Sequence, residues 1–119
     1  MTTYAVLLPG DESHWDNASA EERRAGYARH EAFAKALAER GHTVTGGAEL
    51  THSRGAKVLR RTGGELTVTE GPYAETVEQL TGFYVVESED VDDLVEVCKI
   101  LGRGEGAIEI RAAAGGASS

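Results

Sequence analysis

The stretch of residues 69–86 constrains the fold more than any other part of this chain. A rigid Gly71-Pro72 turn is followed by an acidic segment and then by a β-branched and aromatic run that begins at Gly82. Proline fixes one backbone angle and glycine permits conformations that other residues avoid, so the pair marks a tight turn. The run after Gly82 favours a strand. The stretch therefore predicts a turn that leads into a buried strand, and it names neither a reaction nor a substrate.

Size and charge limit the classes of protein that the chain can belong to. Its 119 residues suffice for one domain, expected at residues 1–111, with a disordered tail at residues 112–119. The net charge of −8 argues against nucleic acid as a partner, because duplex binding needs a basic surface. Cys98 is the only cysteine, so no internal disulfide can form and a reducing cytoplasm is expected. No signal peptide or membrane-spanning stretch is evident, and no membrane association is expected.

The order of helical and strand patterns predicts a particular topology. Ser19 and Glu22 form a capping-box pair at the start of a helix that should end at Gly41. A second helix should begin after Ser88 or Asp90 and end at Gly102. The polar residues between the first strand and the first helix predict a loop. The expected helices cover residues 20–40 and about 90–101, and the expected strands cover residues 3–8, 42–51, 56–61, 65–69, 82–87 and 107–111.

This order, β-α-β-(β-hairpin)-β-α-β, is an α+β, ferredoxin-like split βαβ plan with an inserted hairpin. Both helices should then cover one face of an antiparallel sheet. The other face would carry apolar side chains from residues 83–86 and 108–110. Because a large apolar patch is seldom left exposed, we expect a homodimer in which two sheets pack together.

Several segments together resemble the DGPF, or YCII-related, family of small bacterial proteins. They begin at the first strand and end at the last, and the signature appears as Glu70-Gly71-Pro72-Tyr73 where the family has Asp-Gly-Pro-Phe. Val77 stands where the family usually has Lys. The segments are Tyr4-Ala-Val-Leu-Leu, Gly46-Gly-Ala-Glu-Leu, Glu70-Gly-Pro-Tyr-Ala-Glu-Thr-Val-Glu, Gly82-Phe-Tyr-Val-Val and Gly106-Ala-Ile-Glu-Ile-Arg. The resemblance implies a dimeric α+β barrel.

The same resemblance suggests where chemistry would be found. A His–Asp pair is proposed as the active site of the wider group; His30 corresponds to the histidine, and no aspartate stands at the partner's place. Family members are commonly encoded beside sigma-like transcription regulators, which implies a regulatory protein as a second partner.

The residues themselves offer a few candidates for a site. His30 lies on the sheet-facing side of the first helix, where it is either a general base or a core histidine. Glu70 is its candidate acid partner, and Tyr73 a candidate hydrogen-bond donor to a ligand; a structural role of the turn, with Tyr73 packed and the glutamates solvated, is the favoured alternative. Trp15 could cover a barrel mouth, and Arg111 could bind an anionic group or remain solvated. No cofactor motif or metal-ligand spacing is present, so neither a cofactor nor a metal is expected.

Two functions remain open from the sequence. The first is a dimeric small-molecule-binding or regulatory accessory module. The second is a cleft enzyme that uses His30 and Glu70 for proton transfer or lyase-type chemistry on a small organic substrate. A cavity that contains His30 and a carboxylate favours the enzyme, whereas a solid apolar interior favours the module.

Overall fold

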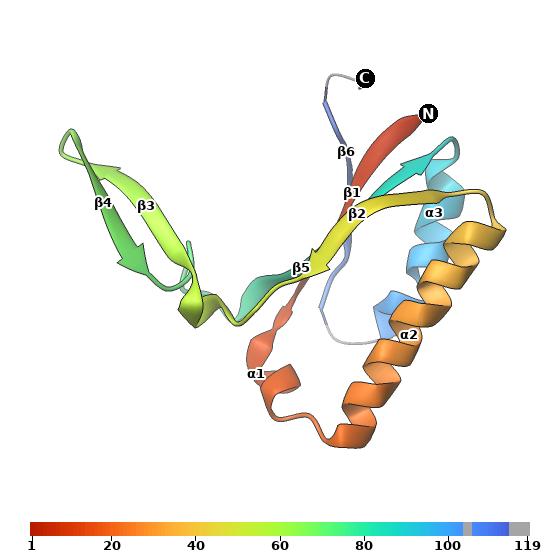
Figure 1. The fold of residues 1–119 in the computed structure, drawn as a ribbon, viewed down its shortest axis with the longest axis horizontal. Helices are drawn as coiled ribbons and strands as arrows, with labels where there is room; N and C mark the ends of the chain where they lie inside the picture. The colour runs from red at the N-terminus through yellow and green to blue at the C-terminus, as the bar shows by residue number, and fades with distance from the viewer. Residues whose placement is uncertain (104–105, 115–119) are drawn as a thin grey trace.

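The computed structural model describes residues 1–103 and 106–114 and shows an α+β protein (Figure 1). Its elements follow one another as β1 (Thr2–Asp11), α1 (Glu12–Asp16), α2 (Ala20–Glu39), β2 (Thr43–Glu49), the 3₁₀ turn η1 (Ser53–Gly55), β3 (Lys57–Thr62), β4 (Glu65–Glu70), β5 (Glu78–Ser88), α3 (Val91–Cys98), the 3₁₀ turn η2 (Leu101–Arg103) and β6 (Glu109–Ala112).

Four strands form an antiparallel sheet in the order β2-β5-β1-β6, and β3 pairs with β4 as a separate hairpin. This order is that of a ferredoxin-like split βαβ unit, with the hairpin inserted between β2 and β5. Helices α2 and α3 lie on one side of the sheet (Figure 1). The predicted fold class is therefore confirmed. None of the helices in the described residues is long and apolar enough to cross a membrane.

Helix α2 begins at the predicted place for the predicted reason. The Ser19 hydroxyl accepts a hydrogen bond from the Glu22 amide at 3.0 Å, and the Glu22 carboxylate accepts one from the Ser19 amide at 2.8 Å. These two bonds satisfy backbone donors that have no partner within the helix. The buried residues Phe33 and Leu37 then turn toward the sheet.

The core lies between the helices and the two central strands. Val6 of β1 and Val86 of β5 are buried there, against α2 and the buried α3 residues Leu94, Val97 and Cys98. Side chains alternate across a strand, so the neighbours of Val6 and Val86 point to the opposite face. Leu7 pairs with Phe83, and Ala5 with Val85, on that face. We call these four residues the open face; each is half-exposed in a single chain.

Several boundaries differ from those that the sequence predicts. Strand β1 continues through Pro9-Gly10, because a register shift between Leu8 and Pro9 lets the chain pass the proline and pair again with β5. The predicted loop after β1 contains helix α1, whose N-cap Asp11 accepts a hydrogen bond from the Ser13 amide at 2.9 Å. Helix α3 ends at Cys98, and a 3₁₀ turn follows.

The C-terminal strand also differs. It runs from Glu109 to Ala112, two residues later at its start and one residue later at its end than predicted. The Ala113 amide still donates a 2.8 Å hydrogen bond to the Thr3 carbonyl. The first residues of the predicted disordered tail, Ala112 and Ala113, are therefore bonded to the sheet. Residues 115–119 lie outside the described part of the chain.

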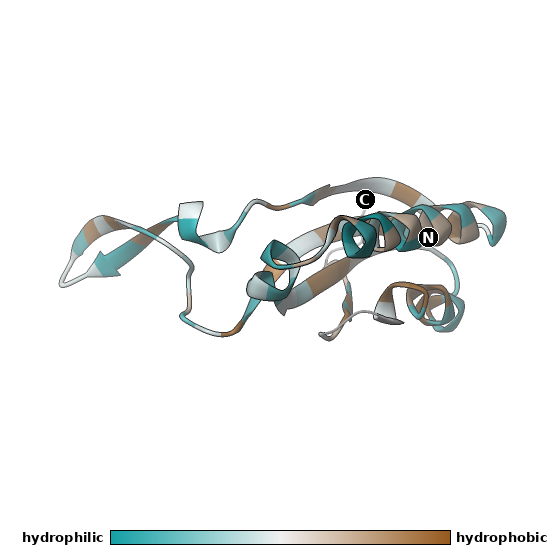
Figure 2. Ribbon diagram, turned by 90° about the horizontal axis from the view of Figure 1, so that it is seen from below, coloured by the Kyte–Doolittle hydropathy of each residue, from teal (hydrophilic) through white to brown (hydrophobic). Residues whose placement is uncertain are grey.

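The β3–β4 hairpin, residues 57–70, projects from the body, and we call it the arm. Figure 2 shows it continuing outward as a thin ribbon along which hydrophobic and hydrophilic residues alternate. The radius of gyration is 16.3 Å, whereas a compact chain of this length has about 13–14 Å. The arm accounts for much of this excess.

A close backbone contact at Gly47 generates a stability prediction. Gly47 has φ +145°, and a Cβ there would lie 2.5 Å from the Phe83 carbonyl oxygen of β5. The Gly47→Ala variant should lower the free energy of unfolding by about 3 kcal/mol, because side chain and strand cannot both keep their positions. Urea unfolding followed by circular dichroism measures this change.

Gly46→Ala is the matched control. A Cβ at Gly46 meets only the Val85 side chain at an ordinary 3.7 Å, so this variant should change the free energy by less than about 1 kcal/mol. Equal losses in the two variants would contradict the close-contact account.

Candidate functional site

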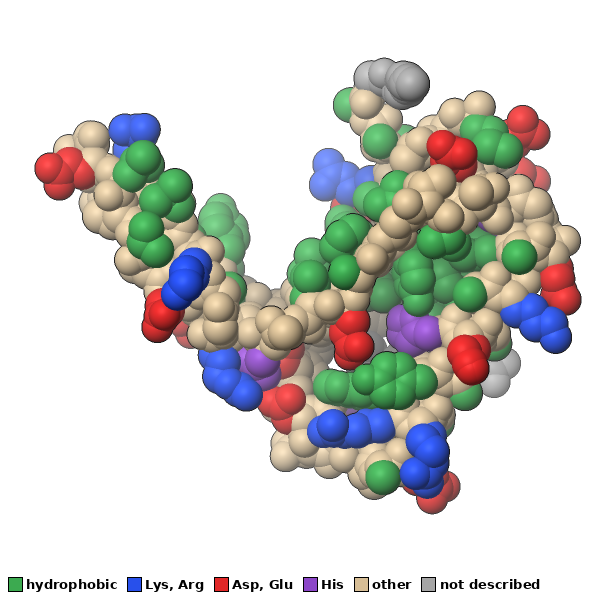
Figure 3. Space-filling view, in the orientation of Figure 1, with side chains coloured by type: hydrophobic (Ala, Val, Ile, Leu, Met, Phe, Trp, Pro, Cys, Tyr) green, Lys and Arg blue, Asp and Glu red, His purple; other side chains and the backbone are tan. Residues whose placement is uncertain are grey.

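A cavity of about 540 Å³ opens between the sheet and the α1–α2 segment. Figure 3 shows a hollow in this region, with hydrophobic, acidic and histidine side chains along its wall. Sites for small organic molecules usually have about 300–1,000 Å³ and a mainly apolar wall with a few polar groups. The lining includes the apolar or aromatic residues Leu8, Trp15, Tyr27, Leu50 and Ile108 and the polar residues Arg29, His30, Glu49, His52, Thr81 and Tyr84.

Trp15 forms one wall of the cavity and is fixed by helix α2. Its ring meets Tyr27 edge-on, with 5.5 Å between the ring centroids. The Arg23 guanidinium lies 5.4 Å from the ring centroid and donates to the Trp15 carbonyl at 3.1 Å. Gly26 permits this packing, because a Cβ there would lie 3.1 Å from the indole ring. The structure thus places Trp15 at the cavity, where the sequence predicted a covering side chain.

His30 and Tyr84 form the polar pair of the cavity. His30 Nδ1 and Tyr84 Oη lie 2.6 Å apart, which joins α2 to β5. Burial lowers the pKa of His30, the nearby Arg29 charge lowers it further, and Glu49 raises it in part. Burial raises the pKa of Tyr84. Both groups are therefore neutral at pH 7.

Depending on its tautomer, the neutral His30 imidazole beside the neutral Tyr84 phenol presents either a hydrogen-bond donor or an acceptor to a ligand at Nε2. When the phenol donates to Nδ1, Nε2 carries a proton and is a hydrogen-bond donor. When Nδ1 donates to the phenol oxygen, Nε2 is an acceptor and a base. No described residue hydrogen-bonds to Nε2. The pair can thus hold a neutral polar group or accept a proton.

Glu49, at the end of β2, lines the cavity and has neither an ion pair nor a side-chain hydrogen bond with a described residue. Other carboxylates along the wall are already engaged. Asp11 caps α1, and hydrogen bonds from Ser13 lower the pKa of its carboxyl. Glu12 accepts hydrogen bonds from the Ser53 amide and hydroxyl, each at 2.6 Å. Glu49 is therefore the acidic group with the most freedom to contact a ligand.

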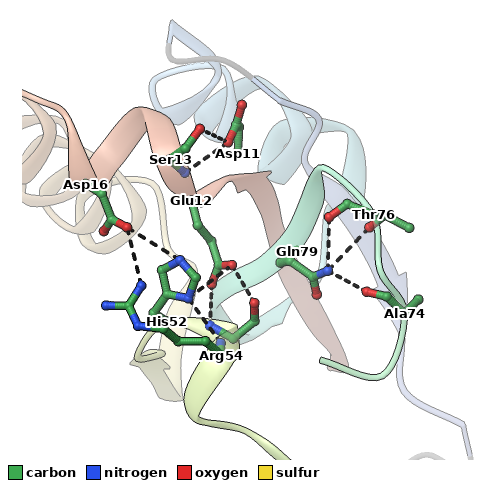
Figure 4. A network of polar contacts seen from close by, with 10 residues as sticks. Asp11, Glu12, Ser13, Asp16, His52, Arg54, Ala74, Thr76 and Gln79 are labelled. Carbon is green, nitrogen blue, oxygen red and sulfur yellow. Dashed lines mark hydrogen bonds and ion pairs between the residues drawn. The ribbon is translucent and has the colours of Figure 1, made fainter. Parts of the chain in front are cut away.

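A polar network connects α1 to the root of the arm (Figure 4). His52 lies between two carboxylates, with Nδ1 3.7 Å from Glu12 and Nε2 3.4 Å from Asp16. Arg54 lies 3.8 Å from Asp16. No sequence pattern singles out His52. The contacts explain it as the residue that holds η1 against α1, at one edge of the cavity.

The structure does not bring the other predicted site residues to His30 within one chain. Glu70 lies at the base of the arm, where it pairs with Lys57 at 2.9 Å and its side chain is 77% exposed. Tyr73 is 79% exposed and contacts Arg60. Arg111 pairs with Glu109 at 3.4 Å, on the open face according to its register with Ala5. In one chain the partner of His30 is Tyr84 rather than Glu70.

His42, Ser88 and Asp93 have the composition of a hydrolase triad but a structural role. His42 Nδ1 lies 2.8 Å from Ser88 Oγ, and Nε2 lies 2.8 Å from Asp93. The His42 hydrogen bond is the main cause of a lowered pKa at Asp93, which Arg40 also contacts. Ser88 is 1% exposed, and its hydroxyl also bonds to the Asp90 backbone. Because the Ser88 hydroxyl is buried, it cannot reach a substrate. The network is therefore structural, and it joins the residue before β2 to β5 and α3.

The described residues support neither thiol chemistry nor metal binding. Burial raises the pKa of the Cys98 thiol to about 11, so thiolate chemistry at neutral pH is excluded. In residues 1–103 and 106–114, no three histidine, cysteine or carboxylate side chains converge as metal ligands do.

The sequence interpretation missed two site residues, Tyr84 and Glu49. For Tyr84, a signal was present in the periodicity of the strand and the helix. Tyr84 and Val86 share a face of β5, and His30 and Phe33 share a face of α2. Strand and helix periodicity together therefore place Tyr84 opposite His30. Glu49 follows an irregular register between Val44 and Gly46, which reverses the face predicted by simple alternation.

Comparison with known proteins identifies the family of this chain. The model of the YCII-related domain matches residues 2–112. A protein of Rhizobium meliloti (strain 1021), called an uncharacterized protein, is 33% identical over 111 residues, which are 91% of this chain and 89% of that protein. The chain, with its ferredoxin-like sheet, inserted arm and His30 cavity, belongs to the YCII-related family.

Proposed function

We propose that this chain is an accessory module that binds a small organic molecule in the cavity of His30 and Tyr84. The observation that carries the proposal is the neutral His30–Tyr84 pair on the wall of a cavity of about 540 Å³. The aromatic and aliphatic walls suit the apolar body of a ligand, and the pair suits one hydrogen-bonding group. Glu49 favours a neutral or cationic group over an anionic one.

A proton-transfer enzyme is the second candidate, and a specific observation favours it. His30 is neutral at pH 7, lies in a cavity, and shares that cavity with Glu49. These are the properties of a general base. Glu49, rather than Glu70, is then the carboxylate that acts beside His30 in one chain.

The cavity proposal can be tested with Trp15, the only tryptophan of the chain. We expect at least one class in a panel of small aromatic alcohols, amides and amines to change its fluorescence. His30→Gln should weaken that binding at least tenfold, or about 1.4 kcal/mol, because glutamine cannot reproduce the Nδ1 bond to Tyr84. Fluorescence titration measures both effects.

Glu31→Gln is the control on the same helix, since Glu31 is exposed and does not line the cavity. It should leave the affinity unchanged. A panel with no effect on Trp15 fluorescence, or binding that His30→Gln leaves intact, argues against the site.

The lowered pKa of His30 predicts how stability depends on pH. The unfolded chain takes up the proton near pH 6.5, the ordinary value, and the folded chain only at lower pH. The unfolded state therefore binds more protons in that interval, and stability falls as the pH is lowered from about 7 to 5. His30→Gln should reduce this slope in thermal unfolding, and an unchanged slope would contradict the assigned burial of a neutral histidine.

We also propose that two copies pack through the open face, so that the module is a homodimer. Leu7, Phe83 and Val85 are apolar and lie opposite the helix layer. An isologous sheet-to-sheet contact covers all of them at once. The single cysteine, Cys98, suits a reducing compartment and so a cytoplasmic module. The acidic net charge suits protein or small-molecule partners rather than nucleic acid.

A charge placed on the open face should separate the copies. We expect a dimer mass for the wild type at micromolar concentration by light scattering, and a monomer for Val85→Glu, because a buried carboxylate without a partner is costly. Val95→Glu on α3 is the control, since Val95 is already 39% exposed. A wild-type monomer would refute the dimer.

A further inference from the structure

The arm exposes an apolar surface that its own chain does not cover. In the β3–β4 register, Leu59 pairs with Val68, and Arg61 pairs with Leu66. Alternation places Leu59, Leu66 and Val68 on one face, and they are 61%, 55% and 63% exposed. An isolated two-stranded hairpin is marginal in water. The arm therefore lacks the packing that normally keeps such a hairpin ordered.

The connection from the arm to β5 adds to this surface. Tyr73 and Val77 are 79% and 73% exposed. The connection is nevertheless held in shape, because the Gln79 side chain donates to the Ala74 carbonyl at 2.6 Å and the Thr76 carbonyl at 3.2 Å (Figure 4). Arg60 Nη2 donates to the Tyr73 carbonyl at 2.7 Å, which ties the connection to β3. Exposed apolar side chains on a held segment indicate a contact surface.

The arm and the open face border the same space. In Figure 1, α2 and α3 lie on one side of the four-stranded sheet, and the arm projects on the other side, so that sheet and arm form a V. Figure 3 shows that this V is empty of side chains and has hydrophobic groups along both of its sides. A body that packs on the open face therefore lies beside the arm as well.

Charge favours a second copy of this chain as that body. The arm, residues 57–70, has three basic and two acidic side chains, a formal charge of +1. The whole chain carries −8, so the remainder carries −9. A basic arm that lies against the acidic body of another copy reduces like-charge repulsion between them.

We propose that the arm and the adjoining Tyr73 and Val77 lie against a second copy of this chain, which fills the V. The inference rests on the sheet-to-sheet dimer proposed above and goes beyond it. It assigns to the inserted hairpin and to the Gly71-Pro72 turn a role in holding the partner. The turn then matters because it sets the direction in which the arm leaves the body.

The test uses the full chain and a triple variant, Leu59→Ser with Leu66→Ser and Val68→Ser. Analytical ultracentrifugation should show a dimer dissociation constant at least tenfold higher for this variant. Val91→Ser with Val95→Ser, on the exposed side of α3, is the control and should change the constant less than twofold. Far-ultraviolet circular dichroism checks that the folds match.

Hydrogen exchange of the wild type supplies a second measurement that needs no change in the arm. Amides of residues 57–70 should exchange at least tenfold more slowly in the wild-type dimer than in the Val85→Glu monomer. Equal exchange, together with an unchanged dissociation constant in the triple variant, would overturn the arm contact and leave the sheet-to-sheet dimer standing.

Two other outcomes overturn the inference differently. A wild-type monomer at all concentrations removes both the dimer and the arm contact. Salt-sensitive binding to duplex DNA that is lost in Arg60→Gln with Arg61→Gln would show that the arm serves a nucleic acid instead of a second copy.

Discussion

The rest of the structure depends on one constraint: the two central strands carry apolar side chains on both faces, and the helices cover only one. On the helix side, Val6 and Val86 are sealed beneath Phe33. On the other side, Leu7 and Val85 are half-exposed. Burial of apolar surface is the main driving force of folding, so this sheet is complete only when something covers the open face. In the homodimer that we propose, a second copy satisfies that need with the same residues on both sides.

The cavity follows from the same architecture. Helix α2 diverges from the sheet at its N-terminal end, where Trp15 and the α1 segment complete the wall. His30, in the middle of α2, meets Tyr84 of β5 on the wall of this cavity, and burial keeps both of them neutral at pH 7. A neutral pair suits the recognition of a polar group within an otherwise apolar ligand. It also leaves a base available if the site does chemistry.

Local signals predicted the parts of the fold that depend on neighbouring residues. Ser19 and Glu22 mark the start of α2, and Gly63-Gly64 turns the arm with positive φ at both glycines. Tertiary contacts decided the rest. Proline at position 9 did not end β1, because a register shift restored its pairing with β5. Glu70 belongs to the most distinctive motif of the sequence, yet in one chain it lies on the arm and pairs with Lys57, because a local motif does not specify which tertiary contacts its side chains make.

The central claim is that a second copy covers the open face. It is tested most directly by nuclear Overhauser spectroscopy on a mixture of isotope-labelled and unlabelled protein, filtered for contacts between copies. The account predicts such contacts from the Leu7 and Val85 methyl groups and the Phe83 ring, and none from the core methyls of Val6 and Leu94. Open-face methyl groups that show no contact between copies, and that a soluble paramagnetic agent reaches freely, would contradict it.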